Sequence, residues 1–291
     1  MLTETMLTNP SDSELAAAVQ ENLFALFRAM VTLPGSELVE GEKLSHHLAF
    51  PSNPMYKGVW RTRLKKEGLD DAIKETIAWF KSRQAPFFFW WTGPGTTPQE
   101  LDEQLMAHGL ISMAEQVKEM APGIISTEVG APGMVADLRK VNEVVLMQAP
   151  KEFVIEEVQD EKSLSDFKRV LMEGYEIPEM MADGWVQAAQ GVGIGKTPWR
   201  MYLGRLNGEP VATNMVFNGA GVAGVYGVAT VPSVRGKGIG GAITLKPLLD
   251  SRAQGYNYAV LFSTEMGIHA YERIGFRHCG ITINRYLWRN G

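Results

Sequence analysis

The sequence is poor in the features that characterise several classes of protein. Cys279 is its single cysteine, so an internal disulfide is excluded and we expect a reducing compartment. The net charge of -5 lacks the basic excess that non-specific nucleic-acid binding needs. Apolar runs such as residues 87–91 (FFFWW) are too short to cross a bilayer, and residues 1–14 do not resemble a signal peptide. We therefore expect a cytoplasmic protein without a nucleic-acid or membrane partner.

The sequence also lacks clusters of histidine, cysteine and acidic residues at metal-ligand spacing, so we expect no metal. Its composition, 45% hydrophobic and 21% charged, is that of a globular protein with a sizeable core. A length of 291 residues exceeds one average domain. We expect two domains, residues 1–147 and 148–291, divided beside Ala149-Pro150.

The spacing of apolar residues predicts an α+β protein. In the first half it predicts helices at 14–33, 69–84 and 98–109, short strands within 43–65 and a buried strand at 86–91. In the second half it predicts strands at 153–158, 200–206, 211–217, 222–231, 258–263 and 281–288. The helices expected there lie at 161–175, 181–190, 239–255 and 265–275. Asn207-Gly208 and the NGAG stretch at 218–221 predict two hairpins.

A weak internal repeat relates the two halves. Residues 86–110 and 258–276 share a strand, a loop, a helix, a glycine and a large apolar residue. The first copy has no glycine-rich loop upstream, because residues 61–73 (RTRLKKEGLDDAI) occupy that place. We expect both halves to share a fold, with a ligand loop kept only in the second.

Two glycine-rich stretches compete as that loop. Gly195-Lys196-Thr197 resembles the end of a phosphate-binding Walker loop, but Gln190 stands where the first glycine is needed, and the preceding residues have a helical pattern. We interpret this stretch as a helix exit.

Gly236, Gly238 and Gly241 match the dinucleotide pattern G-x-G-x-x-G between a predicted strand and a predicted helix. Only 50 residues follow Gly241, too few for the further strand–helix units of a nicotinamide- or flavin-binding sheet. What remains is a turn of backbone amides at a helix N-terminus, which is an anion site. Four basic residues follow in or near it: Arg235, Lys237, Lys246 and Arg252. The alternative is a glycine-rich turn that serves packing alone.

These residues resemble the GCN5-related N-acetyltransferase (GNAT) superfamily. Its motif Arg/Gln-x-x-Gly-x-Gly/Ala is matched by residues 235–240 (RGKGIG), and its later Tyr…Gly-Phe block by residues 270–276 (AYERIGF). The resemblance covers about residues 152–289, is only topological over the first half, and is greatest to tandem members with a degenerate N-terminal copy. It implies a mixed, mostly antiparallel central sheet flanked by helices, in two such domains.

The resemblance also implies acetyl-CoA as a co-substrate. The amides of Gly236, Lys237, Gly238, Ile239, Gly240 and Gly241, following Arg235, would hold its diphosphate. The backbone of Ala229, Thr230 and Val231 would pair with the pantetheine arm, and the backbone near Val231 would polarise the thioester carbonyl. Tyr271 matches the tyrosine that protonates the departing thiolate, and Gly267 would let the ligand approach its helix.

Two departures from the family pattern stand out. Pro247 lies inside the predicted helix and is expected to kink it. Thr264 and Glu265 stand where many members place an asparagine.

The base that accepts the amine proton is open. Glu265 is preferred by position, with His269, Glu176, Glu179 and Asp183 as the other candidates, although solvated surface charge is the simpler interpretation of each. Tyr175, Met180, Met181 and Trp185 would line the acceptor site or belong to the core.

We predict transfer of an acetyl group from acetyl-CoA to a small-molecule or peptide amine by direct transfer in a ternary complex. The alternatives are a non-catalytic CoA-binding module and a transferase that uses a longer acyl-CoA. A homodimer is left open.

Overall fold

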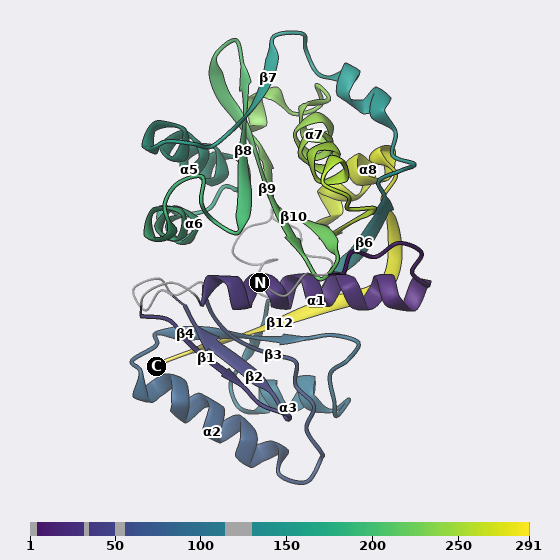
Figure 1. Cartoon of the computed structure of the whole chain (residues 1–291). Helices are drawn as coiled ribbons and strands as arrows, with labels where there is room; N and C mark the ends of the chain where they lie inside the picture. Colours follow the sequence, from purple (N-terminus) through teal and green to yellow (C-terminus); the bar gives the residue numbers. More distant parts are fainter. Residues whose placement is uncertain (1–4, 32–34, 50–55, 114–129, 291) are drawn as a thin grey trace. The chain divides into compact units, whose positions relative to one another are not determined.

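A computed structural model describes residues 5–31, 35–49, 56–113 and 130–290 (Figure 1). These residues divide into two compact units. Unit 1 comprises residues 1–26 and 133–280, and unit 2 comprises residues 27–132 and 281–291. The division at 147/148 expected beside Ala149-Pro150 stays a prediction.

Unit 1 is built on a mixed sheet with the strand order β6-β11-β10-β9-β8-β7. Its strands are β6 (Ala131–Asp137), β7 (Phe153–Glu157), β8 (Trp199–Leu206), β9 (Glu209–Gly219), β10 (Val222–Thr230) and β11 (Tyr258–Phe262). Neighbouring strands are antiparallel except β10 and β11, which are parallel. The expected α+β class with a mostly antiparallel sheet is confirmed.

Both predicted hairpins are present, but the second turns two residues later than its Asn-Gly pair indicates. In the first, Asn207 and Gly208 hold the two positive φ angles, 52° and 85°, of a tight turn. In the second, those conformations belong to Ala220 and Gly221, with φ of 54° and 73°. Asn218 and Gly219 instead extend β9, where Gly219 pairs with Val222.

Helices cover both faces of this sheet. Its helices are α5 (Glu161–Tyr175), α6 (Glu179–Val192), α7 (Ile239–Ala253) and α8 (Glu265–Ile274). In Figure 1, α5 and α6 lie on one side of β8–β10, and α7 and α8 lie on the other. The helix α5 begins at the predicted residue, Glu161, because Asp160 before it accepts a hydrogen bond from the Ser163 N–H at 2.7 Å, within a capping box.

The helix α7 continues through Pro247 from Ile239 to Ala253. A proline has no N–H, so the carbonyl four residues earlier, that of Ile243, loses its helical donor. The buried Asn214 side chain on β9 donates to the Ile243 oxygen at 2.8 Å. The helix therefore keeps this acceptor satisfied with a donor from the sheet.

Unit 2 has its own sheet, with the strand order β1-β2-β3-β4-β12 and β5 paired to β12. The strands are β1 (Glu37–Glu40), β2 (Ser45–Leu48), β3 (Lys57–Trp60), β4 (Phe87–Thr92), β5 (Ile111–Ser112) and β12 (Arg277–Arg289), of which residues 281–289 belong to this unit. Its helices are α2 (Leu69–Ser82) and α3 (Leu101–Ala107). The parallel strands β3 and β4 are connected through α2, as β10 and β11 are through α7.

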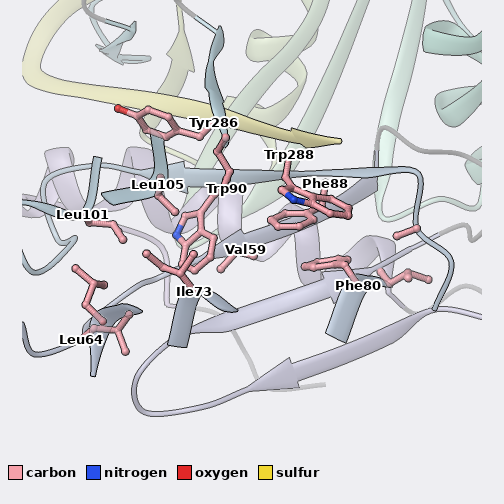
Figure 2. Close-up of a cluster of buried hydrophobic side chains, with 14 residues drawn as sticks. Val59, Leu64, Ile73, Phe80, Phe88, Trp90, Leu101, Leu105, Tyr286 and Trp288 are labelled. Atoms are coloured by element: carbon pink, nitrogen blue, oxygen red, sulfur yellow. The ribbon is translucent and has the colours of Figure 1, made fainter. Parts of the chain in front are cut away.

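The core of unit 2 is rich in aromatic side chains, as Figure 2 shows. Phe80 of α2 stacks on Phe88 of β4 with ring centroids 4.1 Å apart, and Phe88 stacks on Trp288 of β12 at 5.3 Å. Trp90 is fully buried, and its indole N–H donates to the Thr62 hydroxyl at 2.9 Å. The apolar run at 87–91 is therefore a strand with one face in this core.

Candidate active site

The site lies where β10 ends and α7 begins. The chain passes from β10 through a short 3₁₀ turn, η3 (Pro232–Val234), into the glycine turn, which we define as residues 235–241. Gly236 and Gly238 have φ of 78° and 75°, conformations that favour glycine over every other residue. Gly238 is the N-cap of α7. A strand, a tight turn and a helix N-terminus follow one another as the sequence predicted.

The glycines of this turn divide into two pairs by what surrounds them. A Cβ on Gly236 would meet nothing within 4 Å, and one on Gly240 would be 3.6 Å from the Thr230 hydroxyl. A Cβ on Gly238 would instead be 2.5 Å from the carbonyl oxygen of Gln148, and one on Gly241 would be 2.6 Å from Val145. Gly236 thus faces open space and Gly240 makes only an ordinary contact, so a ligand could approach the backbone at this pair, whereas the second pair allows a neighbouring segment to pack.

That neighbouring segment is a 3₁₀ helix, η2 (Glu143–Gln148), which sequence analysis missed. Glu143 pairs with Arg252 near the end of α7 at 2.9 Å, and Gln148 lies against Gly238 at its start. The segment therefore runs antiparallel along α7. The one sequence signal for it is Asn142, whose side chain accepts from the Val144 N–H as an N-cap.

Backbone N–H groups at the start of α7 have no backbone acceptor among the described residues. The Arg235 N–H donates to the Pro232 carbonyl at 3.3 Å, and the Ala242 N–H donates to the Gly238 carbonyl at 3.1 Å. Between these two residues, no backbone N–H has a backbone acceptor in the part of the chain that the structure describes. Residues 236–241 therefore present donors at the positive end of a helix dipole. The exposed Lys237 adds positive charge. These groups fit a phosphorylated ligand.

The end of β10 has an open edge. β10 and β11 pair only at Ala223 and Gly224, and in this register β11 ends level with Tyr226. The Val231 N–H donates to Val211 on β9 at 3.0 Å, so the backbone groups of Thr230 point away from β9. Of the residues at 229–231, Thr230 therefore offers the outward backbone N–H, and the donor predicted near Val231 is already bonded within the sheet.

Arg235, predicted to hold the ligand, has other partners. Its Nε donates to the carbonyl of Thr230 at 3.1 Å, and a terminal nitrogen donates to the carbonyl of Gly174 on α5 at 2.7 Å. Its other terminal nitrogen is 4.0 Å from the Glu176 carboxylate. The guanidinium thus bridges the end of β10 and the end of α5.

Tyr271 and Tyr175 are both half-buried, on α8 and at the end of α5. Burial, and to a smaller degree the Tyr175 phenol, raises the pKa of Tyr271 well above its usual value. Burial also raises the pKa of Tyr175 to about 12. Both phenols therefore keep their protons at neutral pH and can donate hydrogen bonds.

Gly267 has a different immediate role from the one predicted. A Cβ there would be 2.7 Å from the ring of Tyr271, one turn later on α8. The glycine thus makes room for the tyrosine ring, and its contact with a ligand stays a prediction.

The candidate bases differ in what surrounds them. His269 is 88% exposed and lies 3.3 Å from the Glu272 carboxylate. Glu179 and Asp183 each lie 2.6 Å from the ammonium of Lys168. Glu265 is the first residue of α8, and its side chain lies outside the described part of the structure, as do those of Met180 and Met181.

Of the residues predicted to line the acceptor site, Trp185 lies on α6. Its ring packs edge-to-face on the buried Trp199, with centroids 6.4 Å apart. Ile239 and Ala229, predicted to contact the ligand through their backbone, have buried side chains.

The second glycine-rich stretch has the context expected of a helix exit. It follows α6, and a Cβ on Gly195 would be 2.7 Å from the Gln159 side chain. A strand does not precede it, so the interpretation against a Walker loop is confirmed.

The corresponding turn of unit 2 differs from the glycine turn in its charge and in the bonding of the residues before it. Gly68 caps α2 with a φ of 86°, like Gly238 on α7. The N–H groups of Arg63, Leu64 and Leu69, however, donate to backbone carbonyls of Lys43, Thr97 and Lys66. Asp70 and Asp71 occupy the first turn of α2, where they take up the helix dipole.

Within the described residues, no group of three or more histidine, cysteine or acidic side chains could hold a metal ion. In the same part of the chain, no helix has the length and apolar character needed to span a membrane.

Comparison with known proteins finds a family likeness within the second half of the chain. Residues 209–279, from β9 to the start of β12, match the family model of the acetyltransferase (GNAT) domain. This segment, which contains the glycine turn, is therefore similar to the GNAT domain. No curated protein matches it.

Solved structures extend a likeness in fold to nearly the whole length of the chain. A GCN5-related N-acetyltransferase from Kribbella flavida is 15% identical with a TM-score of 0.66, over 93% of this chain and 96% of that one. One from Sphaerobacter thermophilus is 14% identical with a TM-score of 0.59, over 97% and 95%. A tandem GNAT protein from the clavulanic acid biosynthesis pathway is 12% identical with a TM-score of 0.55, over 96% and 95%. These likenesses show the fold.

Proposed function

We propose that this protein transfers an acetyl group from acetyl-CoA to an amine, with both substrates bound at once. The observation that carries the proposal is the glycine turn, whose free amides lie at the helix N-terminus beside the open end of β10. The match of residues 209–279 to the GNAT domain supports acyl transfer as the class of reaction.

The residues present fit a CoA thioester. The amides of residues 236–241 and the ammonium of Lys237 suit the diphosphate, and the open space at Gly236 and Gly240 lets it approach the backbone. The outward N–H of Thr230 suits a carbonyl of the pantetheine arm or of the thioester itself. A donor held by a sheet stabilises charge on such an oxygen without reorganisation.

The reaction needs an electrophile, a nucleophile and a proton donor. The amine nitrogen attacks the thioester carbonyl carbon, a C–N bond forms and the C–S bond breaks. Tyr271 donates its proton to the departing sulfur, so that CoA leaves as a thiol. The raised pKa of Tyr271 keeps this phenol protonated at neutral pH.

The attacking amine must lose a proton. Glu179 and Asp183 are neutralised by Lys168, and His269 is paired at the surface, so we assign none of the three as the base. We propose that the amine proton passes to water, with Glu265 kept as the candidate residue at the start of α8.

Two measurements test the function. Calorimetric titration of CoA into the protein is expected to give saturable heat; the absence of heat would remove the acyl-CoA assignment. A screen of small amines and of peptides with free amines, read as thiol release from acetyl-CoA, should then find an acceptor.

The two alternative functions would be recognised from the same measurements. Heat with CoA but no thiol release from any acyl-CoA would indicate a binding module. Faster release from a longer acyl-CoA than from acetyl-CoA would indicate a different acyl donor.

A further inference from the structure

Arg235 stands at the arginine position of the motif that begins the glycine turn. Its side-chain hydrogen bonds nevertheless go to backbone carbonyls of the protein itself. Its guanidinium connects Thr230, at the end of β10, with Gly174, in the last turn of α5, at 3.1 and 2.7 Å. The two carbonyls are reached from Nε and from a terminal nitrogen of one rigid guanidinium, whereas all donors of a lysine ammonium are on a single nitrogen.

The two elements that Arg235 connects are also in close contact. A Cβ on Gly174 would be 2.8 Å from the Cβ of Ala229 and 3.2 Å from the backbone nitrogen of Thr230. The end of α5 thus packs directly on the part of β10 that offers its N–H to a ligand. A shift of one element must move the other.

The chain reverses immediately after this contact, in the α5–α6 turn, which we define as residues 174–178. Glu176 holds a positive φ of 54°, and both Glu176 and Ile177 donate to the Met172 carbonyl. Tyr175 lies in the same turn, next to Gly174, and its phenol is near enough to Tyr271 to raise that pKa. The turn therefore contributes one wall of the site.

We propose that Arg235 is a positioning residue that couples occupation of the glycine turn to the placement of the α5–α6 turn. Binding of the diphosphate to the amides after Arg235 orders its backbone. The ordered guanidinium then holds Gly174, and with it Tyr175, in place for the acceptor. This inference rests on the proposed function for its ligand, and it predicts that the acyl donor prepares the acceptor side.

Hydrogen exchange measured by mass spectrometry tests the coupling in the full chain, with CoA as the probe. Saturating CoA is expected to slow amide exchange in peptides covering residues 172–178 by at least about fivefold, a change of ~1 kcal/mol in local opening. Arg235→Lys keeps the charge but not the fork, and it should lose most of this CoA-dependent protection. CoA is still expected to bind Arg235→Lys, as calorimetry would show.

Lys237→Gln is the matched control, since Lys237 lies two residues away in the same turn and faces solvent. It should weaken CoA binding, and at saturating CoA it should show the same protection of residues 172–178 as the wild type. Protection that persists in CoA-saturated Arg235→Lys would mean that CoA contacts the α5–α6 turn directly, and would overturn the proposal. An equal loss of CoA affinity in both variants, with exchange unchanged, would make Arg235 a phosphate ligand instead.

The outcome is separable from that of the proposed function. If no amine accepts an acetyl group but CoA binds, the exchange experiment still decides whether Arg235 transmits the effect of CoA binding to the α5–α6 turn. Once an acceptor is known, Arg235→Lys should raise the KM for the acceptor about tenfold, equivalent to ~1.4 kcal/mol, with a smaller change in the KM for acetyl-CoA.

Discussion

Tyr271 is the side chain that we propose protonates the leaving thiolate. Substituting Tyr271→Phe removes the hydroxyl and keeps the ring that packs on Phe276. We expect kcat to fall by about 10²-fold or more, the usual contribution of a general acid, while CoA affinity stays close to the wild type. Thiol-release kinetics and calorimetry measure the two quantities.

Tyr258→Phe provides the control for Tyr271. Tyr258 lies on β11, where its hydroxyl accepts a hydrogen bond from Arg139 at 2.7 Å. The Tyr258→Phe substitution should leave kcat unchanged. An unchanged kcat in Tyr271→Phe would instead assign the proton transfer to another group.

His47 makes the stability of unit 2 sensitive to acid. Burial lowers the pKa of His47 to about 3, and the ring accepts a hydrogen bond from the Trp60 indole at 3.1 Å through its unprotonated Nδ1. Burial also lowers the pKa of His46 to about 4. Since both values lie below the unfolded value of about 6.5, the unfolded state binds protons first as the pH falls.

We therefore expect the free energy of unfolding of unit 2 to be highest above pH 6.5 and to fall as the pH decreases toward 4. The slope should be about 1.4 kcal/mol per pH unit for each of the two histidines. Urea unfolding followed by tryptophan fluorescence from pH 7.5 to 4.5 measures it. His47→Asn keeps an acceptor near the Nδ1 position without a titratable proton and should halve the slope; an unchanged slope would exclude His47 as its source.

Among the elements, α7 depends on a hydrogen bond from β9. Asn214→Leu would leave the Ile243 carbonyl buried without the donor that Pro247 cannot supply. We expect a loss of about 1–3 kcal/mol of unfolding free energy, the cost of an unsatisfied buried acceptor. Chemical denaturation measures it.

Pro247→Ala tests the reason for this loss. An alanine at 247 restores the N–H that reaches Ile243 in a continuous helix. The cost of Asn214→Leu should therefore be smaller in the Pro247→Ala background, by about 1 kcal/mol in a double-mutant cycle. Additive effects would show that Asn214 stabilises the fold by some other contact.

The two kinds of glycine in the glycine turn should respond differently to alanine. Both Gly236→Ala and Gly238→Ala force a side chain into the left-handed region, at a cost of about 1–2 kcal/mol each. Only Gly238→Ala also places a Cβ 2.5 Å from the backbone oxygen of Gln148. We expect the lower Tm in Gly238→Ala, and in Gly236→Ala a loss of CoA affinity out of proportion to its modest loss of stability. Thermal unfolding and calorimetry compare them; equal effects on both quantities would contradict the division.

At the scale of the whole molecule, we expect one CoA to bind per chain. Unit 2 repeats the strand–turn–helix arrangement, but Asp70 and Asp71 occupy the first turn of α2, where their negative charge opposes the binding of a diphosphate. Calorimetry should therefore give a stoichiometry close to one. A second, weaker site abolished by a substitution in residues 61–68 would show that this turn has kept its ligand.

Much of this arrangement was predictable from sequence because it depends on local signals. The helix at 161–175 has a capping residue and an apolar stripe, and its predicted and observed bounds agree. The glycine turn was recognisable because positive φ angles require glycine there. The general class of acyl transfer followed from its resemblance to the GNAT motif.

Features set by distant contacts were not predictable. The strand β6 contains Pro132-Gly133, which indicates a turn, and it exists because it pairs with β11. The packing of η2 against Gly238 joins segments about ninety residues apart, and the two carbonyls bonded by Arg235 come from separate elements. In the second hairpin, the register of β9 with β10 overrode the preference of Asn-Gly for the turn.

The place of β12 has a consequence for synthesis on the ribosome. Its residues 284–289 complete the sheet of unit 2 by pairing with β4, although most of that unit is translated early. The early segment must wait until all of unit 1 has been made, because Phe88 lacks its neighbour Trp288 and Trp90 lacks its partner Tyr286 until then. Nascent chains arrested before residue 281 should therefore leave this segment accessible to proteases and chaperones, and its maturation should be the last step of biogenesis.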